Sequence, residues 1–476
     1  MKKGAFVGIL LALWQPPALA MNLQEYLKAV ESNHRLIKSF SVSTEAAQER
    51  RLSADLELNP RLTAGLGYLS DKSPLGQFAM LGATETTAKD LKLGLAKKFS
   101  TGTSVSVDAA ANEVENEGTL FVPSLQKFSY GSLGVGISQS LWKDSFGRAT
   151  RLRWERQDAA TEAEVGSFDL NRKQLLIEAE KAYWDYIYLD EYLKIGRASL
   201  ERAKRIEAWT RRRVNDGISE RADLLSTQAL VGARQLAVIS AEDDFAAAKR
   251  KIRDFLELSD SENLPEITGD ISSSRSLNSM VNAKGGKVMA LDAYLAALTA
   301  KARALESREI EDNFRPDIVL SGSYNTNNLQ QDKTISEATA KWTDSSLPTW
   351  KVGLNLTYDF DTDVKNSAQS AARKNALAAK LQSERKMLDS ESAWIELNRR
   401  YSEMSKRIET ASEIAKLQVA AAKAQADLFN KGRSITANVI KAEEDAAEAE
   451  LMLTRLKSEQ RKMEAQGRMF VVIEEN

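Results

Sequence analysis

Two long helical stretches constrain the fold of this 476-residue sequence more than any other feature. They cover roughly residues 146–214 and 364–429, and an α-helix of about 68 residues is about 100 Å long, which no ordinary globular domain accommodates. In the second stretch, residues at steps of four and three form a heptad seam. Its members are Met404, Ile408, Ala411, Ala415, Gln418, Ala422, Gln425 and Phe429.

A second seam runs beside the first along the same stretch. Its members are Ile414, Leu417, Ala421, Ala424 and Leu428. A two-stranded coiled coil needs only one seam, so two adjacent seams predict helices with neighbours on both sides, as in a wall of helices. A solvated coiled-coil rod is the alternative reading of these stretches.

The same small turn interrupts the helical pattern in both halves of the chain. It reads N-D-G at 215–217 and N-K-G at 430–432, and a serine follows each glycine at two residues. Glycine accepts the positive φ that ends a helix, so the turns are predicted tips of two helical hairpins. Ser219 and Ser434 are expected to cap the returning helices. The repetition of the turn favours something that docks there.

Four segments show the period-two alternation of β-strands. They are residues 62–68, 133–141, 318–324 and 350–358. In the last, one face is wholly apolar and the other polar or glycine. Aromatic residues stand at both ends of its apolar face, which favours a membrane-spanning strand over a sandwich strand. An additional hairpin is expected at about 90–110, around a turn at 100–102.

The chain is predicted to consist of two repeats of one plan. Each repeat reads helix, strand, loop, strand, very long helix, turn and long helix, and residues 22–58 form the first helix, which Pro60 terminates. The expected boundaries are 21–260 for the first repeat, 261–287 for a linker rich in Ser, Gly and Asn, and 288–476 for the second repeat.

The first 20 residues are predicted to be a secretory signal peptide. Two lysines precede an apolar run, and an A-L-A cleavage site ends it at 18–20. No later segment offers about 18 consecutive apolar residues, so no transmembrane helix is expected. The protein is expected outside the cytoplasm.

Composition and motifs argue against several function classes. The 66 Lys and Arg nearly balance the 67 Asp and Glu, which gives no reason to expect a nucleic-acid partner. There is no cysteine, and the single histidine, His34, is expected to be a surface or packed residue. None of the common nucleotide-binding, hydrolase or metalloprotease motifs is present. We therefore expect no enzyme activity, no cofactor and no metal site.

These segments, in this order, resemble the TolC family of outer-membrane efflux channels. The resemblance covers the N-terminal helix ending at Pro60, "GVGISQSLW" at 134–142, the run at 182–225, and their second-half counterparts. It implies a mainly α fold with β-strands, in which duplicated long helical hairpins form a periplasmic α-barrel. Each protomer of a homotrimer would add four strands to a shared 12-stranded transmembrane β-barrel. The additional hairpin could enlarge that barrel or form an external loop.

The resemblance also implies partners and site residues. The protein would be a passive exit duct in the outer membrane, in contact with its lipid and with a long periplasmic extension. Its tips would dock a periplasmic adaptor linked to an inner-membrane pump, in a tripartite efflux or type I secretion system. The implied docking residues are Gly217, Ile218, Ser219, Gly432, Arg433 and Ser434. The alternative is a periplasmic coiled-coil structural or adaptor protein.

The family often carries acidic residues at a closed entrance, six and nine positions beyond the second tip glycine. This chain has Asn438 and Lys441 there, whereas the first half keeps Asp223. The three residues are the entrance candidates, and the departure predicts a weaker cation-binding gate.

Overall fold

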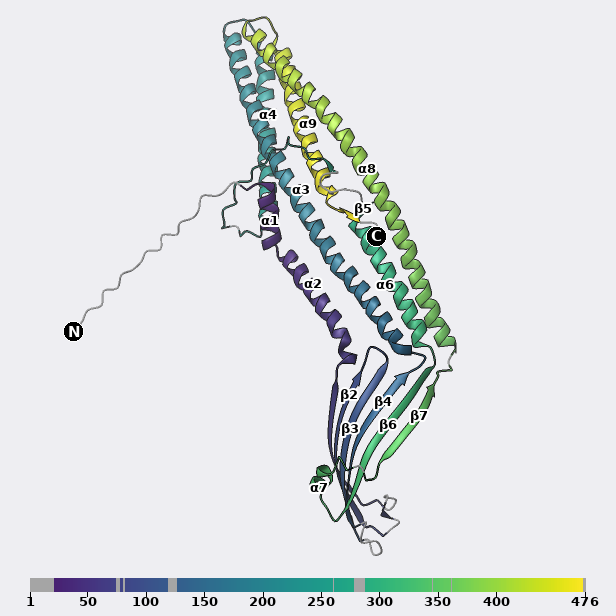
Figure 1. Ribbon diagram of the computed structural model, residues 1–476. Coiled ribbons are helices and arrows are strands. Elements are labelled where there is room, and N and C mark those ends of the chain that lie inside the picture. Colours follow the sequence, from purple (N-terminus) through teal and green to yellow (C-terminus); the bar gives the residue numbers. More distant parts are fainter. Residues whose placement is uncertain are drawn as a thin grey trace, which may run out of the picture. The chain divides into compact units, whose positions relative to one another are not determined.

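The computed structural model describes residues 21–73, 78–79, 82–118, 126–259, 261–277, 287–344, 346–360 and 362–473 (Figure 1). The predicted signal peptide, residues 1–20, lies outside the described residues. The chain divides into two compact units. The first unit comprises Met1–Thr44, Gly166–Tyr294 and Arg385–Asn476, and the second comprises Glu45–Val165 and Leu295–Glu384.

Long helices dominate the structure, as the heptad pattern predicts. The helices are α1 (Leu23–Asn33), α2 (Arg35–Ser53), α3 (Arg148–Asn215), α4 (Arg221–Leu256), α6 (Leu291–Asn313), α7 (Ile335–Ala340), α8 (Thr362–Asn430) and α9 (Thr436–Gly467), with short 3-10 helices at Ala54–Leu58 and Ser145–Gly147. α3 has 68 residues and α8 has 69, so the two predicted long helices are confirmed.

The predicted first helix is interrupted at His34. The backbone of His34 is extended, with ψ of 122°, and α2 begins at the next residue. The cause is Glu257, which ends α4 in a left-handed conformation. Its carboxylate accepts a 2.7 Å hydrogen bond from the Arg35 backbone N–H and lies 2.9 Å from the Arg35 Nε. The acid thus satisfies an unpaired donor at the start of α2.

The start of α3 depends on a buried acid at the end of the preceding strand. The Asp144 carboxylate accepts hydrogen bonds from the backbone N–H groups of Ala149 and Thr150, at 3.0 and 3.3 Å. It also accepts a bond from the Thr150 hydroxyl and lies 3.2 Å from the Lys98 Nζ. The N-terminus of the longest helical hairpin is therefore capped by a charged side chain, where a negative charge is favoured.

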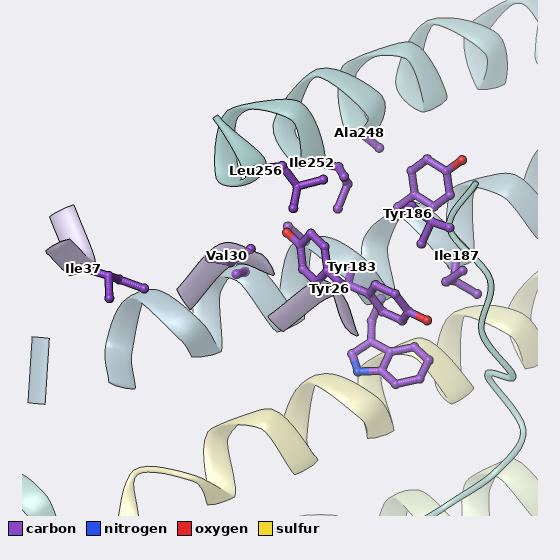
Figure 2. Close-up of a cluster of buried hydrophobic side chains, with 13 residues drawn as sticks. Tyr26, Val30, Ile37, Tyr183, Tyr186, Ile187, Ala248, Ile252 and Leu256 are labelled. Carbon is purple, nitrogen blue, oxygen red and sulfur yellow. The ribbon is translucent and has the colours of Figure 1, made fainter. Parts of the chain in front are cut away.

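The largest apolar core of the first unit joins α1, α3 and α4. Figure 2 shows Tyr26, Tyr183 and Ile252 converging from these three helices. The rings of Tyr26 and Tyr183 have centroids 5.5 Å apart, and Tyr183 meets Trp184 edge to face at 5.1 Å. This aromatic cluster fixes the N-terminal helix against the hairpin of α3 and α4.

A buried polar network ties the predicted linker to the same unit. Arg461 and Glu464 of α9 are 2% and 4% exposed and form a 2.6 Å ion pair. Arg461 also donates to the Ile271 carbonyl, and Glu464 accepts from the Arg275 N–H and the Tyr401 hydroxyl. The described part of the linker is thus fixed by charged hydrogen bonds. Residues 260 and 278–286 of the predicted boundary region lie outside the described residues.

The second unit contains an antiparallel sheet in the order β1-β2-β3-β4-β6-β7 (Figure 1). Its strands are β1 (Arg61–Asp71), β2 (Glu85–Lys98), β3 (Thr103–Glu117), β4 (Lys127–Ser140), β6 (Asp317–Gln331) and β7 (Thr349–Thr357). The four predicted strands and the additional hairpin are confirmed. Of the two alternatives left open for this hairpin, the structure shows the one that enlarges the sheet, because the hairpin lies within it as β2 and β3 and each chain has six strands there instead of four. A second, two-stranded sheet pairs β5 (Lys287–Ala290) with β8 (Phe470–Ile473) in the first unit.

The buried ion pair of α9 predicts a large stability effect. Replacing Arg461 with alanine should lower the free energy of unfolding by about 3 kcal/mol, the lower end for breaking a buried pair, because Tyr401 and Arg275 still donate to Glu464. Thermal unfolding in detergent, followed by circular dichroism, measures the change. Arg455→Ala removes an exposed pair with Glu459 from the same helix and should change little. Equal effects of the two variants would contradict the prediction.

Candidate functional sites at the hairpin tips and on the sheet

The two tips have the same backbone hydrogen bonds. Gly217 N–H donates to the Val214 carbonyl at 3.1 Å, and Gly432 N–H donates to the Phe429 carbonyl at 3.0 Å. The next residue in each turn donates five positions back, Ile218 to Arg213 and Arg433 to Leu428. This is the Schellman pattern, which requires a left-handed residue. Both glycines supply it, with φ of 69° and 73°, and a Cβ at either would meet nothing within 4 Å.

The predicted caps of the returning helices are wrong by one residue. The N-cap of α4 is Glu220, not Ser219, and the N-cap of α9 is Ile435, not Ser434. Glu220 and Asp223 instead form a reciprocal capping box. The Ser434 hydroxyl is 2.9 Å from the Gln425 Oε1 of α8, so it bonds back across the turn rather than forward into α9.

An arginine of the first tip holds the second tip. Arg213 Nη1 donates a 3.1 Å hydrogen bond to the Phe429 carbonyl, which also accepts the Gly432 N–H. The Arg213 guanidinium lies over the Phe429 ring, 4.7 Å from its centroid. Phe429 is 1% exposed and packs with Ile206 and Val439. We call this pair, Arg213 and Phe429, the tip latch. It brings the two turns side by side within one chain.

A cleft of about 300 Å³ lies next to the tip latch, between α3, α8 and α9. A buried acid of α9, Glu443, stands at its edge and is 5% exposed. It pairs with Arg202 of α3 and accepts a 3.4 Å hydrogen bond from the Ser199 hydroxyl. This ion pair is a second polar link between the two hairpins.

The entrance candidates lie in the first two turns of the returning helices. Asp223 accepts a 3.3 Å hydrogen bond from the Glu220 N–H, and Asn438 is exposed. Lys441 pairs with Asp445 at 2.7 Å, and this hydrogen bond raises the pKa of the lysine. Lys441 therefore stays positively charged, with its charge partly offset by Asp445. Among the described residues, no hydrogen bond or ion pair links Asp223 with Asn438 or Lys441.

The two heptad seams of α8 have different surroundings. The apolar members of the first seam are buried or half-buried, and Met404, Ala415 and Phe429 are all less than 6% exposed. In the second seam, Ile414 and Leu417 are 48% and 64% exposed. The chain therefore fills one seam itself and leaves the other open.

α4 carries an exposed seam of the same kind, which sequence reasoning missed. Its members follow steps of four and three and are Leu225, Ala229, Gly232, Leu236 and Ile239. The three large side chains of this seam are 48–66% exposed. The first unit thus presents two unlike open seams.

The six-stranded sheet has one apolar face. A single row of cross-strand neighbours runs through all six strands, and each member is an exposed apolar residue. The row consists of Leu62, Leu95, Val107, Val135, Tyr324 and Trp350. A folded chain in water buries such a surface, so this face is suited to an apolar environment.

The opposite face of the sheet is polar and rich in small residues. The adjacent row consists of Thr63, Gly94, Asp108, Gly134, Asn325 and Thr349. A hollow of about 740 Å³ lies against the sheet, and most of its lining residues, including Ser104, Ser138 and Ser323, belong to this face. The sheet is therefore concave on its polar side.

Among the described residues, no helix has both the length and the apolar character needed to cross a bilayer. Within the same ranges, no group of three or more histidine, aspartate or glutamate side chains is placed to hold a metal ion.

Comparison with known proteins decides the family. Residues 26–257 match the family model described as "Outer membrane efflux protein". The outer-membrane channel OprN aligns over 94% of this chain and 89% of its own, with a TM-score of 0.64 and 18% identity. Residues 26–257 of the chain belong to the outer membrane efflux protein family.

Two further channel structures share the fold of this outer membrane efflux protein. The Neisseria gonorrhoeae MtrE channel, in its open state, aligns over 94% of this chain and 88% of its own, with a TM-score of 0.65 and 14% identity. The outer membrane protein VceC of Vibrio cholerae aligns over 93% and 94%, with a TM-score of 0.64 and 14% identity. None of the curated proteins compared with the chain matches it in sequence.

The tip latch of this efflux protein predicts a local change in dynamics. Arg213→Ala should increase hydrogen exchange in residues 426–440, because the Phe429 carbonyl and ring lose their partner. Hydrogen exchange with mass spectrometry measures it. Arg212→Ala is the matched control, since the Arg212 guanidinium donates to the Ala208 carbonyl of its own helix. Unchanged exchange in Arg213→Ala would show that the latch does not stabilise the second tip.

Proposed function

We propose that the protein is the outer-membrane channel of a tripartite efflux or type I secretion system. It acts as a passive trimeric exit duct, and the energy for export comes from an inner-membrane pump. The observation that carries this proposal is the row of six exposed apolar residues across the sheet. Lipid is the environment that such a face fits, and the polar concave face then lines a water-filled lumen.

The apolar face extends over several rows of the sheet. On β7 it comprises Trp350, Val352, Leu354 and Leu356, which are 65–74% exposed. On β1, Leu62, Leu66 and Tyr68 are 69–86% exposed. Such runs of outward apolar side chains fit contact with lipid.

The open seams support assembly with further copies. An exposed seam on α4 and a different one on α8 fit a heterologous, ring-closing interface. Leu417 lies 15 residues before Gly432, and Gly232 lies 15 residues after Gly217. Because the tip latch aligns the two turns, these positions lie at one level, and a large residue faces a small one. Ala424 lies eight residues before Gly432, and Leu225 lies eight residues after Gly217. This small residue and this large residue pair in the same way.

Assembly predicts a specific cross-link. The chain has no cysteine, so Gly232→Cys with Leu417→Cys provides the sole thiols. Mild oxidation should join copies covalently up to trimers, seen by denaturing electrophoresis. Gly232→Cys with Lys416→Cys is the control, because residue 416 lies one position off the seam. A cross-link no stronger than in the control would argue against this interface.

The tips are the proposed docking site for a periplasmic adaptor. Gly217, Ile218, Gly432 and Arg433 are exposed, and Ser219 and Ser434 are half-buried at equivalent places. The tip latch presents both turns together, so one partner can contact the pair. Asp223, Asn438 and Lys441 lie one to two turns further along and are the proposed entrance residues.

Docking predicts a loss of coupling without loss of folding. Gly217→Asp or Gly432→Asp adds a charge where nothing lies within 4 Å, at a backbone cost of about 1–2 kcal/mol for positive φ. Export should fall at least tenfold in a drug-sensitivity assay, while outer-membrane levels stay normal. Gln382→Asp, at an exposed site of α8 far from the tip, should leave export unchanged. Normal export in both glycine variants would exclude docking at the tips.

A periplasmic coiled-coil structural or adaptor protein is the second candidate. The exposed α4 and α8 seams would suit it. A coiled-coil protein of this kind gives no role to the exposed apolar face of the sheet. Cell fractionation distinguishes it from a channel, because a channel pellets with the outer membrane and needs detergent to be extracted.

A further inference from the structure

The hairpin of β2 and β3 is the feature that the proposed function does not explain. It pairs over its whole length, with 11 residue pairs between β1 and β2, 14 between β2 and β3, and 13 between β3 and β4. The pairing of β4 with β6, which joins the two halves of the chain, also has 13 pairs. The hairpin is therefore as complete a part of the sheet as the strands around it.

The hairpin also shares the two faces of the sheet. Leu95 and Val107 continue the exposed apolar row, and Asp108 belongs to the polar row. A loop folded over the sheet would not keep this alternation in register with both neighbouring strands. The alternation places lipid-facing and lumen-facing side chains on the hairpin as on the other strands.

Residues of the second half are fixed to this hairpin. Glu113 of β3 is 5% exposed and accepts a 2.9 Å hydrogen bond from the Ile335 N–H at the start of α7. The Trp342 Nε1 donates to the Ala110 carbonyl at 3.0 Å. The connection between β6 and β7 therefore depends on β3, which fixes the hairpin's place in the sheet.

The two edge strands of the sheet, β1 and β7, each have one side without a paired strand among the described residues, and their geometry allows them to pair with each other between copies. β1 and β7 have 11 and 9 residues and contain no proline, and their registers with β2 and β6 run without a bulge. Long, regular edges of this kind are protected in soluble proteins, so they are expected to pair with another chain. Because all neighbouring strands are antiparallel and the sheet has six of them, the two edge strands β1 and β7 run in opposite directions. A second copy can therefore add its β7 to β1 in the same antiparallel pattern, and the ring can close.

We propose that three copies close a barrel of 18 strands, three times six, through pairing of β1 with β7 of the next copy. The proposal rests on the proposed trimeric channel. Barrel diameter grows about linearly with strand number, so this lumen is about 1.5 times as wide as that of a 12-stranded barrel. The hairpin is thus a widening element, and the exit admits bulkier cargo than four strands per copy would allow.

Edge pairing is tested by cysteine pairs in the otherwise cysteine-free chain. Thr63→Cys on β1 is combined in turn with Lys351→Cys, Gly353→Cys or Asn355→Cys on β7, all on the polar face. One combination should give covalent trimers in at least fivefold excess over Thr63→Cys with Val352→Cys, whose β7 thiol lies on the opposite face. Absence of cross-linking in all three combinations would overturn the 18-stranded barrel. The Gly232 and Leu417 cross-link then shows whether the trimer itself survives.

Lumen width is tested by removing the hairpin. A short turn joining Asp71 to Lys127 deletes β2 and β3 and keeps the direction of every remaining strand. Ser132→Cys, on the polar face of β4, reports on the lumen through labelling by maleimide-polyethylene glycols of increasing size added from outside. The cut-off radius should fall by about one third, from 18 to 12 strands. An unchanged cut-off in an assembled deletion variant would overturn the proposal. If the deletion variant does not assemble, the edge cross-links decide.

Discussion

The structure depends on the surfaces that one chain cannot cover by itself. The sheet turns a complete row of apolar side chains outward and leaves the backbone donors and acceptors of β1 and β7 open at its edges. The first unit leaves a seam open on α4 and another on α8. Because hydrophobic burial and satisfied backbone hydrogen bonds are what make a fold stable, these are the surfaces that lipid and further copies would cover in the proposed channel.

The helical hairpins show how very long helices are held in register. Alanine occupies five of the 13 positions in the two seams of α8 and permits close approach there, but small side chains alone allow helices to slide past one another. Polar links prevent this at defined levels. Arg213 bonds to the Phe429 carbonyl at the tips, Arg202 pairs with the buried Glu443 behind them, and the Tyr401 hydroxyl of α8 donates to the buried Glu464 far along α9. Each link places a charged group where only one register satisfies it.

Much of this fold could be predicted from sequence because its elements obey simple periods. Heptad spacing located α3 and α8 within about two residues, period two located the strands, and glycine located both tips. The errors have one origin, which is contact between residues distant in sequence. The break at His34 depends on Glu257, and the place of the additional hairpin depends on pairing with both β1 and β4. The shifted caps at Glu220 and Ile435 reflect a tight turn that takes one residue more than the serine pattern indicated.

The candidate sites could be predicted from the sequence less completely than the fold. Glycine and serine marked the tips, whereas nothing in the local pattern marked Arg213 as the residue that joins them. The open seam on α4 was readable in principle, since Leu225, Leu236 and Ile239 follow the heptad spacing, but only the structure shows that it is unfilled. Periodicity reports that a face is apolar and does not report what covers it.

The even number of strands in the sheet limits how such a channel can change during evolution. A strand gained singly would reverse one edge and send the following helix to the wrong side of the membrane. Only whole hairpins preserve both the edge polarity and the side from which the helices leave. In the proposed three-fold ring, each hairpin gained or lost would therefore change the bore in a step of six strands.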